Sequence, residues 1–206
     1  GVKPQMLGDV AEDLARLAGP ETVVLSILAG VELDTLAARF PSAKAVVRIM
    51  PNLAAAIGKS PIALSDRGLD AAGKDAVARL MAPLGQPEWL ASEALFDAVT
   101  ALAGSGPAFV YRFIDALAAG AAKLGLPPDQ AQRLALATVE GAGALASASE
   151  NAPGQLPRRV ASPGGTTQAG LDALDAGGAL DALVAATLEA AADRSAEMAR
   201  EARDNS

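Results

Sequence analysis

Apolar residues in the first 92 positions recur either at helical spacing or in short uninterrupted runs. Residues 7–18 place apolar side chains three or four positions apart, with acidic residues between them, which predicts a helix closed by a Gly-Pro pair. Residues 22–28 and 45–50 are apolar runs rich in β-branched residues, a pattern typical of strands buried on both faces. A short helix over 33–40 separates them, so the pattern predicts a right-handed βαβ unit with parallel strands.

Three further elements extend this rhythm. Residues 61–65 predict another strand, 69–84 another helix and 88–91 a last strand. We therefore expect the C-terminal part of a Rossmann-type parallel sheet domain. The glycine-rich phosphate loop of a dinucleotide fold is missing from this half, so we expect its first βαβ unit to be absent. The alternative is a small complete α/β layer, but its first edge strand would be poorly protected.

From Ser92 onward the pattern changes to alanine-rich helical periodicity. Helices are predicted over 107–124, 128–148, 166–176 and 180–203, each preceded by glycine or proline. The charge shifts as well, because the first 92 residues carry 9 basic and 10 acidic groups, whereas the rest carry 8 and 14. We predict an α/β plus all-α protein, with a partial Rossmann domain at 1–92 and an all-helical domain at 93–206.

Composition bears on how the helical part is stabilised. Alanine supplies 50 of the 206 residues and aromatic residues only 3%. Helix faces made of alanine and glycine allow close approach but carry little side-chain volume to fill a monomeric core. We therefore predict a homodimer formed through residues 107–206, with a compact monomeric bundle as the alternative.

Several classes of function are excluded by what the chain lacks. It has no cysteine and no histidine, which rules out thiol nucleophiles, disulfides, zinc sites and histidine-based catalysis, so no metal site is expected. A net charge of −7 without a basic cluster argues against a nucleic-acid partner. No apolar run reaches membrane length and no signal peptide is present, so we expect a cytoplasmic protein.

Two glycine-rich segments stand directly before predicted helices. Ser-Pro-Gly-Gly-Thr-Thr at 162–167 leaves backbone N–H groups uncovered where a helix begins, and Gly-Ser-Gly-Pro at 104–107 has the same construction. Such groups, together with the helix dipole, form a site for a carboxylate or phosphate. The alternative for each is an ordinary loop with a capping hydroxyl. Together they favour an anionic small molecule as ligand.

Asn52 follows a predicted strand, in the sequence Met-Pro-Asn. Ligands of open α/β sheets bind outside the carboxyl ends of the strands, and an asparagine there offers a donor and an acceptor to an amide such as nicotinamide. A turn role after proline is equally consistent with the spacing.

These motifs in this order resemble the pyrroline-5-carboxylate reductase family. The resemblance covers residues 2–200 and is carried by five stretches, at 2–5, 47–52, 97–109, 160–167 and 194–197. It implies a Rossmann domain followed by a helical domain that interlocks two subunits. It also implies hydride transfer from C4 of NADPH or NADH to the imine carbon of 1-pyrroline-5-carboxylate, which gives L-proline in the last step of proline biosynthesis.

The resemblance also implies which residues form the site. The turn at 162–167 would hold the substrate carboxylate, and Thr167 would lie near the ring nitrogen as the catalytic hydroxyl. The expected substrate-binding residues share one pocket and are Ser105, Gly106, Pro107, Ser162, Gly164, Gly165, Thr166 and Thr167. The expected cofactor-binding residues are Val2, Lys3, Pro4 and Asn52.

Two departures from the family pattern matter. Leu53-Ala54 replaces the usual Thr-Pro, which removes a hydroxyl near the phosphates. The phosphate loop is missing, so the chain as written is expected to be inactive.

Two rival interpretations remain. A β-hydroxyacid dehydrogenase shares the architecture but needs a catalytic lysine, for which Lys123 at a helix end is a poor candidate. A non-catalytic oligomerisation module would suit the alanine-rich half but would not need the turn at 162–167.

Overall fold

The computed structural model describes residues 6–204, which form two compact units. The first, here called the sheet unit, comprises Gly1–Pro107 and Thr187–Ser206, and the second, the helical unit, comprises Ala108–Ala186. The sheet unit includes the segment after Ser92, in which Glu93 is bonded to Arg48 in the sheet and Ala103 to Asn52. The domain boundary at Ser92 stays a prediction.

The sheet unit contains a four-stranded sheet in the order β1-β2-β3-β4. The strands are β1 (Val23–Ser26), β2 (Ala45–Met50), β3 (Ser60–Arg67) and β4 (Gly85–Trp89). β1 pairs with β2 and β3 with β4 in parallel, but β2 and β3 are antiparallel. The α/β class is confirmed, and the expectation of parallel pairing throughout is wrong at this one pair.

The link between β2 and β3 explains the antiparallel pair. Residues 51–59 hold only the short 3-10 turn η2 (Leu53–Ile57), which ends at Gly58 with φ of 68°. A parallel return needs a crossover of about a dozen residues or more. The chain therefore reverses direction and pairs back on the strand it has just left.

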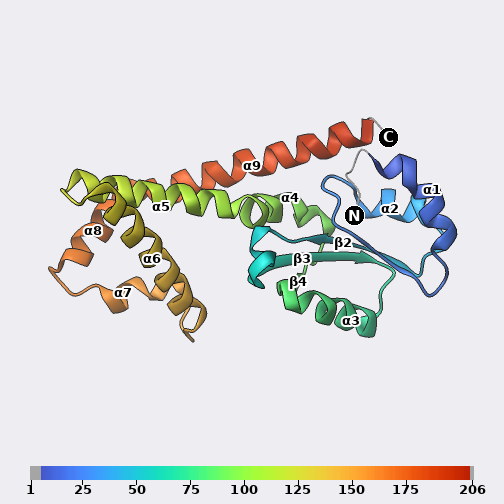
Figure 1. The fold of residues 1–206 in the computed structure, drawn as a ribbon, viewed down its shortest axis with the longest axis horizontal. Helices are drawn as coiled ribbons and strands as arrows, with labels where there is room; N and C mark the ends of the chain where they lie inside the picture. Colours follow the sequence, from blue (N-terminus) through green and yellow to red (C-terminus); the bar gives the residue numbers. More distant parts are fainter. Residues whose placement is uncertain (1–5, 205–206) are drawn as a thin grey trace. The chain divides into compact units, whose positions relative to one another are not determined.

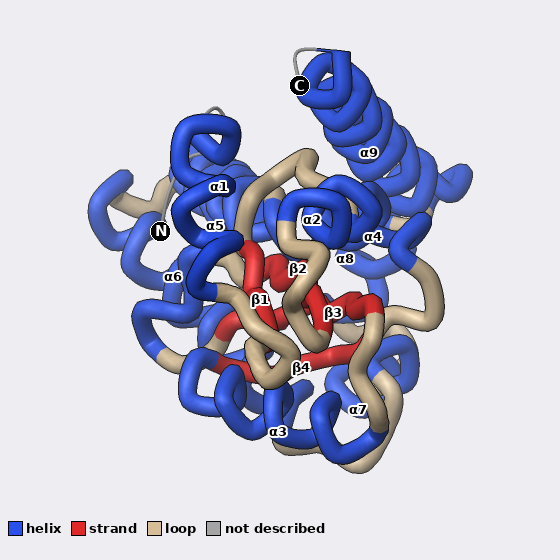
Figure 2. The backbone as a smooth tube through the Cα atoms, turned by 90° about the vertical axis from the view of Figure 1, so that its right-hand side faces the viewer, coloured by secondary structure: helices blue, strands red, loops and turns tan. Residues whose placement is uncertain are grey.

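Helices cover both faces of the sheet (Figure 2). α1 (Leu7–Leu17) and α2 (Leu33–Arg39) pack with Val46 of β2 on one face. α3 (Ala71–Met81) contributes Val77 to a second core on the other face, which contains Val47. Neighbouring positions of β2 thus enter opposite cores, as a strand buried on both faces requires.

Several elements differ in extent from their sequence prediction: β1 is shorter than 22–28, β3 is longer than 61–65, and α3 and β4 are shifted for reasons that single residues explain. The helix expected over 69–84 is shorter, because the Asp70 carboxylate accepts a hydrogen bond from Gly73 N at 2.7 Å and caps α3; a separate 3-10 turn, η3 (Ala82–Leu84), follows. β4 begins earlier than the strand expected over 88–91. At its first residue, Gly85, φ is 149° and a Cβ would lie 2.0 Å from the Ser60 carbonyl oxygen, so only glycine allows this approach.

The connecting segment from Glu93 is helical but irregular. It contains η4 (Glu93–Leu95), α4 (Phe96–Val99) and the π-helical turn η5 (Thr100–Gly104). α5 (Gly106–Lys123) follows and continues into the helical unit (Figure 1).

The four long helices predicted in the C-terminal half are confirmed. They are α5, α6 (Pro128–Ser147), α8 (Thr166–Leu174) and α9 (Ala179–Asp204), and the short α7 (Pro157–Val160) follows the 3-10 turn η6 (Pro153–Gln155). Another 3-10 turn, η7 (Ala176–Gly178), lies between α8 and α9. Within the helical unit α5 and α6 meet through alanines, with Ala118, Ala131 and Ala135 buried.

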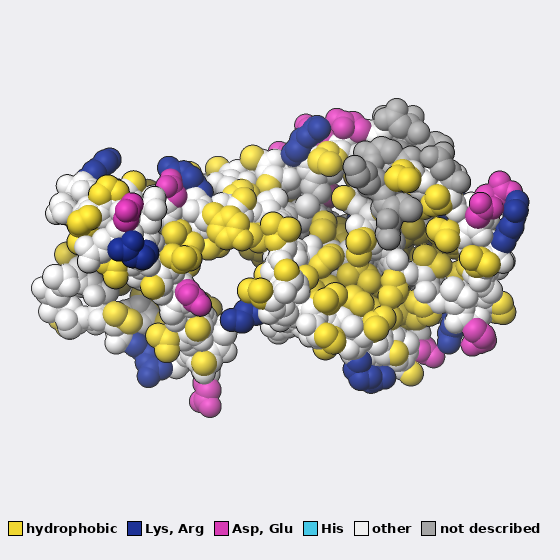
Figure 3. Space-filling model, in the orientation of Figure 1, with side chains coloured by type: hydrophobic (Ala, Val, Ile, Leu, Met, Phe, Trp, Pro, Cys, Tyr) yellow, Lys and Arg dark blue, Asp and Glu magenta, His cyan; other side chains and the backbone are white. Residues whose placement is uncertain are grey.

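The α5 helix leaves large apolar side chains exposed. Among them are Val110, Tyr111 and Phe113, and apolar side chains lie on the surface over α5 in Figure 3. The run Glu93–Lys123 is long and apolar enough to cross a membrane by length and composition alone. The expectation that no apolar run reaches membrane length is wrong for this segment. This is weak evidence for a membrane, because apolar helices of soluble proteins pass the same test.

Candidate active site

A cavity of about 450 Å³ opens in the sheet unit at the carboxyl ends of β1 and β2. Its walls come from the loop after β1, the end of β2, the segment from Glu93 to Ser105 and the last turns of α9. The lining residues are Ala29, Gly30, Glu32, Arg48, Met50, Glu93, Ala94, Phe96, Asp97, Thr100, Ser105, Ala191, Arg194, Ser195, Met198 and Ala199. This is the edge at which open α/β sheets bind ligands.

Asn52 lies beside this edge and is held in place on three sides. Its backbone N–H donates to Ser60 Oγ at 2.8 Å, and its side-chain oxygen accepts from Ala54 N at 2.9 Å. Its amide nitrogen donates to the Ala103 carbonyl at 2.8 Å. The side chain therefore acts both as a turn residue and as a tie between β2 and η5. Each end of an amide retains further hydrogen-bonding capacity for a ligand.

The approach to Ser105 is shaped by a π-helical turn. Ser105 N donates to the Thr100 carbonyl at 2.9 Å, and Thr100 Oγ1 donates to the Phe96 carbonyl at 2.8 Å. Single π turns of this kind occur frequently at functional sites. Ser105 lines the cavity, and Gly106 and Pro107 follow at the start of α5, both half-buried.

Sequence reasoning gave no role to Arg48, the one charged residue of β2. Its side chain is 9% exposed, and its Nη1 lies 2.5 Å from Glu93 Oε1. The guanidinium also lies 4.1 Å from the centroid of the Phe96 ring. The same Glu93 oxygen accepts from Leu33 N at 2.8 Å, at the start of α2. The sequence signals at this position are a charge inside an otherwise apolar run and membership of the stretch 47–52 that carries the family resemblance.

The last turns of α9 bring two more polar residues to the cavity. Ser195 Oγ donates to Asp97 Oδ1 at 2.7 Å. The Arg194 guanidinium donates hydrogen bonds to the carboxylates of Glu197 and Glu201, and these bonds raise its pKa above the usual value. Arg194 lines the cavity and is cationic there, as arginine is throughout the physiological pH range. Among the described residues no group of three acidic, histidine or cysteine side chains is placed to hold a metal ion.

The Ser-Pro-Gly-Gly-Thr-Thr turn belongs to the helical unit and forms the start of α8. Gly164 has φ of 72°, which favours glycine, and Gly165 is the N-cap residue, whose N–H donates to the Ser162 carbonyl at 2.9 Å. A Cβ on Gly165 would lie 2.5 Å from Ser162 Oγ. Thr166 begins the helix, and Thr167 is half-buried in its first turn.

This turn has the features of a carboxylate site. No side chain caps α8 at Gly165, so the first N–H groups of the helix remain available to an anion. Ser162 and Thr166 are exposed and add hydroxyl groups nearby.

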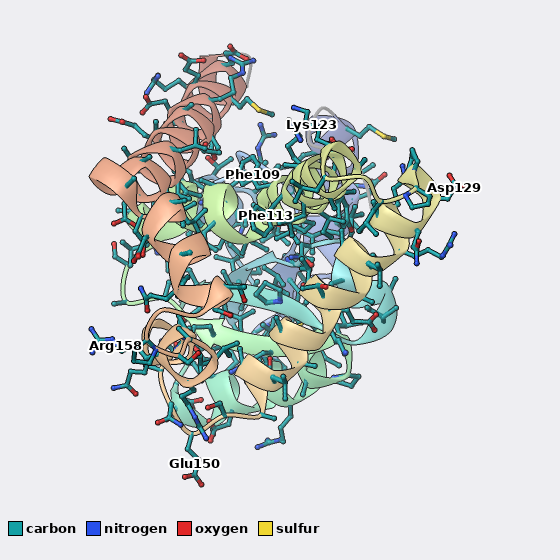
Figure 4. All side chains as sticks on the ribbon, turned by 90° about the vertical axis from the view of Figure 1, so that its left-hand side faces the viewer. Phe109, Phe113, Lys123, Asp129, Glu150 and Arg158 are labelled. Atoms are coloured by element: carbon teal, nitrogen blue, oxygen red, sulfur yellow. The ribbon has the colours of Figure 1, made fainter. Side chains whose placement is uncertain are left out.

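The other predicted site residues divide between the units. Ser105, Gly106 and Pro107 belong to the sheet unit and the turn to the helical unit, so the pocket that they are expected to share stays a prediction. The predicted cofactor contacts at Val2, Lys3 and Pro4 lie outside the described residues. Lys123 lies at the exposed end of α5 (Figure 4).

Comparisons with known proteins agree on one family. The model for pyrroline-5-carboxylate reductase dimerisation matches residues 93–198. Pyrroline-5-carboxylate reductase from Pseudomonas aeruginosa is 40% identical over 201 residues, which is 97% of this chain and 73% of that protein. The enzyme from Pisum sativum is 41% identical over 96% of this chain and 71% of its own.

Solved structures give the same result. A pyrroline-5-carboxylate reductase from Coxiella burnetii matches with a TM-score of 0.90 at 32% identity, over 96% of this chain and 73% of that one. Pyrroline carboxylate reductase from Plasmodium falciparum, solved with NADP bound, matches with a TM-score of 0.79 at 28% identity. It covers 97% of this chain and 79% of its own.

Proposed function

This chain belongs to the pyrroline-5-carboxylate reductase family, and we propose that it catalyses the family's reaction. A hydride passes from C4 of NADPH or NADH to the imine carbon of 1-pyrroline-5-carboxylate, and the product is L-proline. The resemblance found in the sequence, the family model and the relatives all lead to this reaction.

The observation that carries the proposal is the turn that opens α8. The substrate is a ring imine with a carboxylate, and the uncapped helix start behind Gly164 and Gly165 suits that carboxylate. Ser162, Thr166 and Thr167 supply hydroxyl groups around it. In the sheet unit, Asn52 lies at the strand edge where a dinucleotide would present its nicotinamide, and Ser105, a proposed substrate-binding residue, lines the cavity beside that edge.

Thr167 is proposed to assist the imine nitrogen. Hydride transfer to a neutral C=N bond leaves negative charge on nitrogen, so the nitrogen must be protonated or accept a hydrogen bond in the transition state. The chain has no histidine for this task. An alcohol is too weak an acid to protonate the nitrogen itself, so Thr167 acts as a hydrogen-bond donor. The proton comes from water or from substrate that binds already protonated.

The working form is proposed to be a cytoplasmic homodimer made through the helical half. The dimerisation family model over 93–198 and the exposed apolar side chains of α5 support it. The family resemblance also implies further assembly of dimers into a ring, but this proposal depends on the dimer alone.

The rival functions are less well supported. A β-hydroxyacid dehydrogenase needs a lysine on an inner helix, whereas Lys123 lies at an exposed helix end. A non-catalytic oligomerisation module does not explain the α8 turn or the family relationship.

The direct test is oxidation of NADPH and of NADH by the protein as its gene encodes it, followed at 340 nm with racemic 1-pyrroline-5-carboxylate. We expect turnover with formation of L-proline, identified by mass spectrometry, and none with a β-hydroxyacid in the reverse direction. No oxidation with either cofactor, by a protein that is folded and dimeric, would overturn the proposal.

A further inference from the structure

The cavity edge of β2 carries an ion pair that the proposed function does not use. Arg48 stands two residues before Met50, so both side chains point to the same face of β2, and both line the cavity. Arg48 is bonded to Glu93 at 2.5 Å and stacks on Phe96 at 4.1 Å. Among the described residues, the charge partner of Arg48 is Glu93, which lies 45 residues further along the chain.

Glu93 has a second task in the same place. The oxygen that receives Arg48 also accepts from Leu33 N at 2.8 Å, where the N-cap residue Glu32 provides no side-chain capping bond. One carboxylate thus joins the start of α2, the middle of β2 and the first turn of the segment that ends at Ser105. Replacing a buried ion pair by apolar residues is often neutral for stability, so the presence of this pair is weak evidence for a purely stabilising role.

The segment held by this pair joins two parts of the proposed site within the sheet unit, the cofactor edge at the end of β2 and the substrate-binding residue Ser105. At one end it is tied to β2 through Arg48 and Glu93, and near its other end Ala103 is tied to Asn52 at 2.8 Å. These two bonds hold the end of β2, with Met50 and Asn52, in a fixed position relative to Ser105. Hydride transfer requires donor and acceptor within a narrow range of distance, so a small shift between these parts is costly to the rate.

We propose that Arg48 and Glu93 are positioning residues for hydride transfer, which fix the Glu93–Ser105 segment against the cofactor edge of β2. This inference rests on the proposed function. The directional ion pair sets one register of the segment, whereas an apolar contact in its place would let the segment slide.

The test uses Glu93→Gln, Arg48→Lys and the charge-free double variant Arg48→Met/Glu93→Leu in the gene-encoded protein. Glu93→Gln keeps an acceptor for Leu33 N but removes the charge. We expect kcat to fall at least tenfold in Glu93→Gln and in the double variant, with the KM for NADPH changed less than threefold. Arg48→Lys keeps the positive charge and should therefore lose less of kcat than the double variant. The matched control is Arg67→Lys. Arg67 forms an exposed ion pair with Asp34 that joins β3 to α2, and this variant should have the kcat of the wild type.

A second measurement separates positioning from simple stability. With NADPH deuterated at the transferred position, the isotope effect on kcat should rise in Glu93→Gln and in the double variant, because hydride transfer becomes slower than product release. A double variant that melts like the wild type and keeps wild-type kcat and isotope effect would overturn the inference. A wild-type protein without reductase activity would overturn the proposed function itself, and with it this inference.

Discussion

The two compact units bury their residues in opposite ways. The sheet unit encloses large side chains such as Leu36, Ile62 and Leu64, each at most 1% exposed, and it also buries Arg48. In the helical unit the buried residues are alanines, Ala118, Ala131 and Ala135. The sheet unit is therefore stabilised by its own core, whereas the helical unit gains little from burial within one chain. In the proposed homodimer, a second chain supplies the apolar area that the helical unit does not bury by itself.

The two units also differ in how their candidate binding residues are held in place. The sheet unit carries a strand edge and a cavity fixed by long-range bonds such as Asn52 to Ala103. The helical unit carries a local turn whose geometry is set by two adjacent glycines, Gly164 and Gly165. A cofactor edge needs a rigid support, and an anion site needs only a helix start.

The largest expected effect is on the core of the sheet unit. Leu64→Ala should lower the free energy of unfolding by about 2–5 kcal/mol, because the side chain is fully buried and leaves a cavity. Ala131→Gly, the corresponding truncation in the helical unit, should cost about 1 kcal/mol. Urea denaturation measures both free energies of unfolding. For Leu64→Ala it is followed by the fluorescence of Trp89, the single tryptophan, and for Ala131→Gly by circular dichroism. Equal losses at the two sites would remove the contrast between the units.

The next effect concerns association. Phe113→Asp should raise the dimer dissociation constant at least about a hundredfold, since it removes about 1.5–3 kcal/mol of apolar burial and places a charge in the interface. The control is Ile57→Asp in the sheet unit, which is 73% exposed and should dissociate like the wild type. Light scattering at micromolar protein should show no monomer in the wild type and in the control. A wild-type monomer that remains folded contradicts this prediction.

Thr167→Ala should lower kcat/KM for pyrroline-5-carboxylate about tenfold to a hundredfold, or about 1.4–3 kcal/mol, for loss of a hydrogen bond to developing charge. Thr167→Ser should recover most of the loss, and the KM for NADPH should not change. Steady-state kinetics at fixed pH measure all three. If the alanine variant keeps its activity while Ser105 or Tyr111 replacements abolish it, the donor lies elsewhere.

The smallest effect belongs to the cofactor edge. Asn52→Leu should raise the KM for NADPH, or lower kcat, by more than about twofold, since the nicotinamide amide loses a partner. The variant also loses the bond to Ala103, so its melting temperature should be recorded beside the kinetics. Changes of less than twofold in both constants would show that Asn52 is only a turn residue.

Local patterns were enough to predict most elements. β2 has the predicted bounds, Ala45–Met50, because an apolar run buried on both faces leaves little ambiguity. β4 was placed too late, since Gly-Gln-Pro at 85–87 resembles a turn; proline is tolerated there because β4 is an edge strand. The antiparallel return of β3 depends on the length of a link rather than on the strand's own residues.

The residues of the candidate site also differ in whether neighbouring sequence is enough to predict them. The turn at 162–167 and the segment at 104–107 could be found from sequence, because their chemistry depends on neighbouring residues at a helix start. The pair of Arg48 and Glu93 could not, because its partners are 45 residues apart and only the fold brings them together. Ser195 was part of a recognised motif, but its bond to Asp97 across 98 positions is likewise a tertiary fact.

The most direct test of this account is binding of L-proline to the α8 turn, measured as a shift in melting temperature. At a concentration a hundred times the dissociation constant, L-proline should stabilise the wild type by about 2.7 kcal/mol, or about 5–10 °C. Gly165→Ala, whose new Cβ would press on Ser162 Oγ, should lose most of the shift. Gly154→Ala, whose Cβ would meet nothing within 4 Å, should retain it. An unchanged melting temperature in the wild type, or an equal shift in both variants, would contradict the assignment of the carboxylate to this turn.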